Sequence, residues 1–186
     1  MDVYVARKNF FNFWGVKCRI LSLDGQLMHF VYQKALKLKE DITVYADAGR
    51  QVPQLHIKAR QIIDFSAAYD VVEVQSGAKL GALRRKGWAS FARDEWEVLD
   101  VYDQPIATIL EDSLAMALLR RFLSNLIPQN YTFYVGQAPV GQVQGTWNPF
   151  LVKYLVDFSQ DPNRYLDRRL ALAGIVLLMC IEGRQN

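Results

Sequence analysis

The chain has 186 residues, of which 51% are hydrophobic and 22% are charged, and its formal net charge is +3. This length and composition predict a single domain over residues 1–186 with a sizeable core, and exclude a disordered or low-complexity protein. The mild positive charge does not by itself indicate a protein that binds nucleic acid or an anionic membrane.

The two cysteines, Cys18 and Cys180, show neither a disulfide framework nor the spacing of metal ligands. Met1–Tyr4 lacks the basic and apolar stretches that begin a secretory signal peptide. We therefore expect a cytoplasmic protein, since reduced cysteines are typical of that compartment, and we expect no cofactor and no metal.

Short extended segments dominate the first 110 residues. Leu55, Ile57 and Ala59 alternate with polar residues, which is the pattern of a strand with one buried face, and Ile42–Asp47 alternates in the same way. Turn signals separate such segments, as at Asp24-Gly25. Further strands are predicted at Tyr4–Lys8, Lys17–Ser22, Leu27–Ala35, Asp70–Gln75, Leu80–Lys86, Trp96–Tyr102, Tyr131–Val135, Gly141–Trp147 and Leu151–Phe158.

Residues 113–127 interrupt the strand pattern. Leu114, Leu118 and Phe122 recur at helical spacing, and Pro128 ends the pattern, so an additional helix is predicted here. We expect this helix to cover one end of a barrel. The alternative is a helix that lies in a membrane interface, because basic residues stand beside Phe122.

The segment Leu170–Ile181 contains no charged residue and no polar face. Its eight large apolar side chains would each gain roughly 1.5–3 kcal/mol from burial, so exposure to water is implausible. Twelve helical residues reach about 18 Å, whereas a bilayer core is about 30 Å thick. The segment is therefore predicted to be a helix enclosed by roughly twelve strands, and no transmembrane span is expected.

Two caps compete for the start of this last helix. Asp161-Pro162 suits the start, with Asp161 as the N-cap and proline at the first helical position, and Asp167 is a second candidate. Gly183 is the predicted stop.

A strand-rich chain that ends in a hydrophobic helix resembles the tubby C-terminal-domain-like superfamily, and most of all its scramblase and LURP-one-related branch. The residues that carry this resemblance are Tyr69-Asp70-Val71-Val72, Gly81-Ala82-Leu83-Arg84-Arg85-Lys86, Arg93-Asp94-Glu95-Trp96 and Asp167-Arg168-Arg169-Leu170-Ala171-Leu172-Ala173. The resemblance implies a closed barrel of about twelve antiparallel strands around a central helix. It also implies contact with phospholipids, because tubby-like domains bind phosphoinositides.

Scramblase activity is less well supported by the resemblance. The chain has no proline-rich N-terminal extension and no cysteine-rich palmitoylation run. Its acidic segment Asp157–Asn163 makes a poor calcium loop, because Tyr165 falls where a ligand is wanted and no glycine follows.

A basic cluster near a predicted hairpin is the candidate binding site. It combines cationic side chains with an aromatic one, a combination that suits anionic headgroups or phosphates. The alternative without a binding function is a solvated strand face whose cations pair with Asp94, Glu95 and Glu97. The cluster consists of Lys79, Arg84, Arg85, Lys86, Trp88 and Arg93.

Catalytic motifs are missing from the sequence. His29 and His56 stand in no recognisable motif, and the glycines mark hairpins instead of a phosphate loop. The leading hypothesis is a non-enzymatic module that binds anionic phospholipid at the cytoplasmic surface of a membrane. The alternatives are a protein-interaction or scaffold domain without a small ligand, and a scramblase-type lipid transporter. No nucleic-acid partner is expected, and a protein partner is left open.

Overall fold

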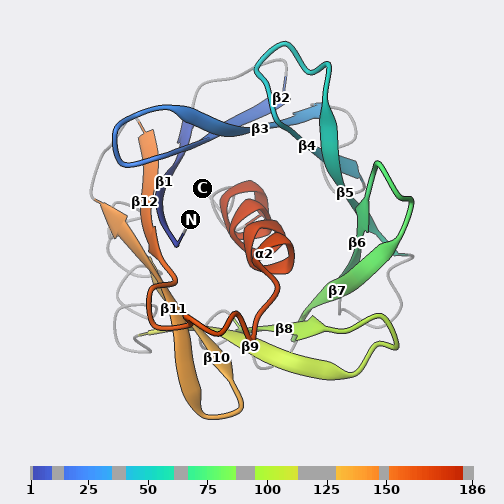
Figure 1. The fold of residues 1–186 in the computed structure, drawn as a ribbon, viewed down its shortest axis with the longest axis vertical. Coiled ribbons are helices and arrows are strands. Elements are labelled where there is room, and N and C mark those ends of the chain that lie inside the picture. Colours follow the sequence, from blue (N-terminus) through green and yellow to red (C-terminus); the bar gives the residue numbers. More distant parts are fainter. Residues whose placement is uncertain are drawn as a thin grey trace, which may run out of the picture.

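The structure is a computed structural model, and it describes residues 2–9, 15–34, 41–60, 67–86, 95–112, 129–146 and 151–181. Within these residues, twelve antiparallel strands form a closed barrel around one helix, as Figure 1 shows in a view down the barrel. The strands are β1 (Val3–Asn9), β2 (Gly15–Leu21), β3 (Leu27–Lys34), β4 (Asp41–Tyr45), β5 (Pro53–Ala59), β6 (Ala68–Glu73), β7 (Lys79–Arg85), β8 (Glu95–Leu99), β9 (Pro105–Glu111), β10 (Asn130–Val135), β11 (Ala138–Thr146) and β12 (Leu151–Asp157), and the helix is α2 (Arg168–Ile181).

Each strand pairs with its neighbours in the chain, and the pairing of β1 with β12 closes the ring. In that closing ladder Tyr4 lies opposite Val156 and Arg7 opposite Lys153. Closure leaves no unpaired sheet edge, which is one way in which proteins avoid edge-to-edge aggregation. The predicted twelve-stranded barrel with a central helix is confirmed. The predicted helix at 113–127 lies outside the described residues.

The connections of such a meander alternate between the two ends of the barrel. The end called here the hairpin end carries the β2–β3, β4–β5, β6–β7, β8–β9 and β10–β11 turns and the start of α2. The N-terminal residues lie there too, because the backbone N–H of Phe158 donates to the carbonyl of Asp2 at 2.6 Å. At the opposite end, the buried Lys8 ammonium donates to the carbonyl of Met179 near the end of α2, at 2.7 Å.

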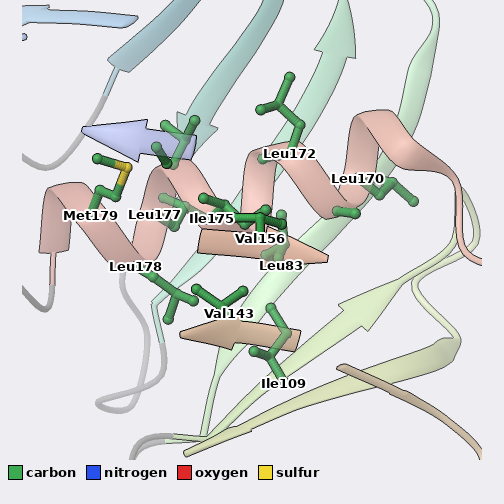
Figure 2. Packing of buried hydrophobic residues seen from close by; sticks show 14 of the residues in the cluster. Leu83, Ile109, Val143, Val156, Leu170, Leu172, Ile175, Leu177, Leu178 and Met179 are labelled. Carbon is green, nitrogen blue, oxygen red and sulfur yellow. The ribbon is translucent and has the colours of Figure 1, made fainter. Parts of the chain in front are cut away.

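The helix α2 is the centre of the core. Every residue from Leu170 to Cys180 is buried, and inward side chains of the strands pack against it, among them Leu83, Ile109, Val143 and Val156 (Figure 2). The prediction of an enclosed terminal helix is therefore confirmed. Its physical cause is the missing polar face, which leaves no side of the helix suited to water.

The predicted start at Asp161-Pro162 is wrong, and the alternative at Asp167 is confirmed. The side-chain carboxylate of Asp167 accepts a hydrogen bond from the backbone N–H of Arg169 at 2.8 Å. The backbone carbonyl of Asp167 accepts one from the backbone N–H of Ala171 at 3.0 Å. Asp161 lies in the turn before the helix, where its buried carboxylate accepts from the backbone N–H groups of Tyr165 and Leu166. Local capping signals do not distinguish these two roles, because both use a carboxylate that accepts backbone N–H bonds.

Candidate functional site

The predicted basic cluster lies on β7 and the residues that follow it. Arg84 lies directly opposite Glu97 of β8, and its Nη2 stands 2.6 Å from Oε2 of that residue. Lys86 follows two positions later, so it faces the same way, and its Nζ lies 2.7 Å from Glu95 and 3.4 Å from Glu97. Glu95 and Glu97 share one face of β8, and Arg84 lies opposite Glu97, so the register brings the two cations against the two carboxylates.

These ion pairs change the acidity of their members. The hydrogen bond with Glu95 is the main cause that raises the pKa of Lys86. Burial alone would raise the pKa of the Glu97 carboxyl, but Arg84 and Lys86 outweigh burial and lower it. Lys86 therefore stays charged at neutral pH, and the carboxylates of Glu95 and Glu97 offset the charge of the cations beside them.

Lys79 is also paired, near the hairpin end. Its Nζ lies 2.9 Å from Asp103 and 3.3 Å from Asp70, and both carboxylates also contact Arg60 at 2.6 Å. The hydrogen bonds from Arg60 and Lys79 lower the pKa of Asp103 to about 2. Lys79 therefore belongs to a network of two cations and two anions.

The remaining members of the cluster are placed differently. Arg85 is half-buried and alternates with the outward-facing Arg84, so it points toward the barrel interior beside Trp96, its partner in the register. Trp88 and Arg93 lie outside the described residues. The structure thus brings Arg84 and Lys86 together on one outer face, and it separates them from Lys79 and Arg85.

A second group of cations lies on β12, β1 and β2. Arg7 stands directly opposite Lys153 on one side and Arg19 on the other, so three cations form a row across three adjacent strands. Arg7 and Arg19 are exposed and alternate with buried residues, which places the row on the outer surface. Directly opposed residues have Cα atoms about 4.5–5.5 Å apart, so the row spans only about 10 Å.

No carboxylate of the described residues forms an ion pair with this row. The same holds for Lys17, which follows the row toward the opposite end of the barrel, two positions from Arg19. Like charges directly opposite one another destabilise a sheet. The fold tolerates that cost here, whereas it offsets the cations of β7 with carboxylates. We call Lys153, Arg7, Arg19 and Lys17 the cationic face.

Aliphatic side chains run beside the cationic face, one pleat closer to the hairpin end. Leu155, Val5, Leu21 and Leu27 are register partners in turn, on β12, β1, β2 and β3. Leu155 and Leu27 keep 36% and 37% of their surface exposed, and Leu23 in the adjoining turn keeps 63%. Val5 and Leu21 are half-buried, so a partly exposed row of apolar groups lies parallel to the row of cations.

Sequence reasoning missed this face. Arg7, Arg19 and Lys153 lie far from one another in the sequence, and only the β1–β12 closure brings the first and last strands together. The sequence offered two signals that could have found it: the alternation that marks which residues of each predicted strand face outward, and the expectation of a closed barrel. Combining the two requires the order of the strands and their register.

Comparison with family models matched residues 27–179 to the LURP-one-related family. The chain belongs to the LURP-one-related family. This family is part of the tubby-like C-terminal domain superfamily, and the twelve-stranded barrel agrees with that assignment. Neither the curated proteins nor the solved structures that were compared with the chain gave a match.

Two further observations on this LURP-one-related domain concern metal sites and membrane-spanning helices. Among the described residues, no group of three or more His, Cys, Asp or Glu side chains is placed to hold a metal ion. None of the helices in that part of the chain has the length and apolar character needed to cross a membrane.

Proposed function

We propose that this LURP-one-related protein is a non-enzymatic module that binds anionic phospholipid and lies peripherally on the cytoplasmic surface of a membrane. The cationic face on β12, β1 and β2 is the proposed contact. The observation that carries the proposal is the row Lys153–Arg7–Arg19, three cations in register without a carboxylate partner among the described residues.

Electrostatics support an anionic partner. Each basic residue near an anionic bilayer contributes about 1 kcal/mol of attraction, so the four residues of the cationic face supply about 4 kcal/mol. The paired cations of β7 contribute less, because Glu95 and Glu97 are brought to the membrane with them. The attraction falls with ionic strength, since the Debye length is only about 8 Å in physiological salt.

The aliphatic row supports a lipid surface over a nucleic acid. Peripheral proteins place apolar side chains at the boundary between headgroups and acyl chains and cations at the headgroups. Leu155 and Leu27 are exposed within one pleat of the cations, so both kinds of group can reach a membrane together. Phosphate contacts to a nucleic acid would need the cations but not the aliphatic row.

Liposome flotation tests the proposal with a single substitution. Arg7→Glu replaces the central cation and sets a carboxylate between Lys153 and Arg19. It changes the charge of the face by two units, so binding to vesicles of phosphatidylcholine with phosphatidylserine should weaken roughly thirtyfold. The same substitution turns two like-charge pairs into opposite-charge pairs, so the free energy of unfolding should rise, by roughly 0.2–1 kcal/mol for each pair.

The matched comparison is Arg84→Gln with Lys86→Gln, which removes two cations from the predicted cluster. Wild type and this comparison variant should float with the anionic vesicles and be released by salt, and neither should float with phosphatidylcholine alone. The proposal fails if wild type does not float with anionic vesicles, or if Arg7→Glu floats as well as wild type. Loss of flotation only in the Arg84 and Lys86 variant would move the contact to β7.

A further inference from the structure

A pocket of about 280 Å³ opens at the hairpin end, between the first turns of α2 and the wall formed by β3, β5 and β6. Its volume is close to the lower end of the range of small-molecule sites, roughly 300–1,000 Å³. It lies apart from the cationic face, since no residue of that face lines it. A ligand of this pocket would therefore be independent of the proposed membrane contact.

Apolar side chains form much of the pocket wall. Leu55 from β5 and Leu172 from α2 are buried in it, with 3% and 6% of their surface exposed. Val52, in the turn before β5, stands at the rim and is 49% exposed. The pocket thus offers an apolar interior that solvent reaches from the hairpin end, which suits a ligand with an apolar body.

Two polar side chains of the pocket keep unused hydrogen-bonding atoms. Nδ1 of His29 lies 2.7 Å from the amide oxygen of Gln54, and because that oxygen only accepts, Nδ1 carries the proton. Burial lowers the pKa of His29, and the bond to Gln54 opposes this only in part, so the ring is neutral at pH 7. Nε2 of His29 is then an acceptor, and the amide nitrogen of Gln54 is a donor. Neither atom has a partner among the described residues.

The charged side chains around the pocket are already satisfied. Arg169 reaches across from α2 to Glu73 of β6 at 2.7 Å and also pairs with Asp167. The second carboxylate oxygen of Glu73 accepts from Ser76 at 2.6 Å. Arg168 is held by Asp2 and Asp161. A charged ligand would find these charges already balanced by their partners, whereas an uncharged one needs no counter-charge.

We propose that the pocket binds a small uncharged molecule that has an apolar body and a hydroxyl group. The hydroxyl donates to Nε2 of His29 and accepts from the amide nitrogen of Gln54, while the body lies against Leu55 and Leu172. One hydroxyl satisfies both open polar atoms, because it is both donor and acceptor. A carboxylate cannot donate to Nε2, and an ammonium cannot accept from Gln54.

Imidazole NMR of the full chain tests the proposal, with cyclohexanol as the probe. The chain has only two histidines. His56 pairs with Asp41 and does not line the pocket, so its resonances serve as an internal reference. Cyclohexanol should shift the His29 resonances in a saturable way, in roughly the millimolar range expected of so small a ligand, and leave His56 unchanged. Cyclohexanecarboxylate and cyclohexylammonium, which share the same body, should bind more weakly.

Two variants locate the binding. Val52→Trp places an indole at the exposed rim and should abolish the shift of His29. Gln54→Met removes the amide donor and should weaken binding roughly two- to tenfold, whereas Gln144→Met on the outer face of β11 should not. Arg7→Glu should bind cyclohexanol as wild type does, so this test does not depend on the outcome of liposome flotation.

Three results would overturn the proposal: no saturable shift of His29, preference for the carboxylate or the ammonium, or a shift that Val52→Trp leaves unchanged. The spectrum of the protein without probe also bears on it, because a proton on Nε2 instead of Nδ1 would contradict the acceptor role.

Discussion

The guanidinium of Arg168 joins the N-terminus, the connection after β12 and the start of α2. Its Nη1 lies 2.7 Å from the carboxylate of Asp161, and its Nε and Nη2 each lie 3.1 Å from Asp2. Nη2 also donates to the carbonyls of Asp161 and Phe158, at 2.7 and 3.2 Å. Arg168 is 17% exposed and the Asp161 side chain is fully buried, so solvent screens this pair only slightly.

Replacement of Arg168 by methionine should therefore cost much more than the loss of a surface ion pair. The buried carboxylate of Asp161 would keep its two backbone N–H donors but lose its cation. Removing one partner of a buried pair costs about 3–5 kcal/mol, a large part of a domain's net stability of roughly 5–15 kcal/mol. For a chain of this length the melting temperature should fall by roughly 6–20 °C.

The loss should also depend on pH. Burial alone would raise the pKa of Asp161, but the hydrogen bonds from Arg168, Tyr165 and Leu166 outweigh burial and lower it. The ionised carboxylate thus stabilises the fold above its unfolded pKa of about 3.9, and this contribution disappears as the pH falls through the lower folded value. Arg168→Met should raise the folded pKa, so the difference from wild type should be large at about pH 7 and smaller at about pH 3.

Urea unfolding measured at both pH values checks this prediction, with an unchanged slope as the condition for comparing midpoints. The control is Arg164→Met, which changes an exposed arginine in the same connection and should stay within about 0.5 kcal/mol of wild type. If Arg168→Met lowers the free energy of unfolding by less than about 1 kcal/mol, the pair contributes no more than an exposed ion pair, and the argument from burial is refuted.

Two further substitutions test the core. Leu177 of α2 is fully buried, so Leu177→Asp should abolish soluble folding, whereas Leu23→Asp at an exposed turn should not. Circular dichroism and size exclusion chromatography check both variants. A Leu177→Asp protein that is soluble, folded and as stable as wild type would contradict the enclosed helix. Gly81 in β7 has a φ of 155°, and a Cβ there would lie 2.2 Å from the carbonyl oxygen of Leu99, so Gly81→Ala should cost about 2 kcal/mol or more in thermal unfolding. Gly77→Ala, where a Cβ meets no atom within 4 Å, should cost only the backbone strain of about 1 kcal/mol, and equal losses at the two glycines would argue against the clash.

Much of the fold was predictable from local patterns. The alternation at Leu55–Ala59 reports which side of a strand is buried, and the structure buries Leu55 and Ile57 while leaving Lys58 outside. The run Leu170–Ile181 lacks a polar face, which forces enclosure whatever surrounds it. These signals are reliable because each residue contributes its own transfer free energy, independently of distant parts of the chain.

The start of the helix and the sites were less predictable, because they depend on partners far away in the sequence. Asp161 looked like an N-cap, but it lies buried against Arg168, whose other partner is Asp2 at the far end of the chain. The cations of β7 were visible as a cluster, but their pairing with Glu95 and Glu97 follows from the β7–β8 register.

The sequence by itself determined the strands and the buried helix, through periodicity and hydrophobicity, and its resemblance to a known family implied the closed barrel. The tertiary structure decided which charges stand together. Closure of β1 on β12 sets Arg7 between Arg19 and Lys153, although Arg7 and Lys153 are separated by most of the chain. The pocket between His29, Gln54 and α2 likewise exists only once the barrel has closed around the helix. Burial is a property of each segment, whereas electrostatic neighbourhoods and cavities arise from the register and order of strands.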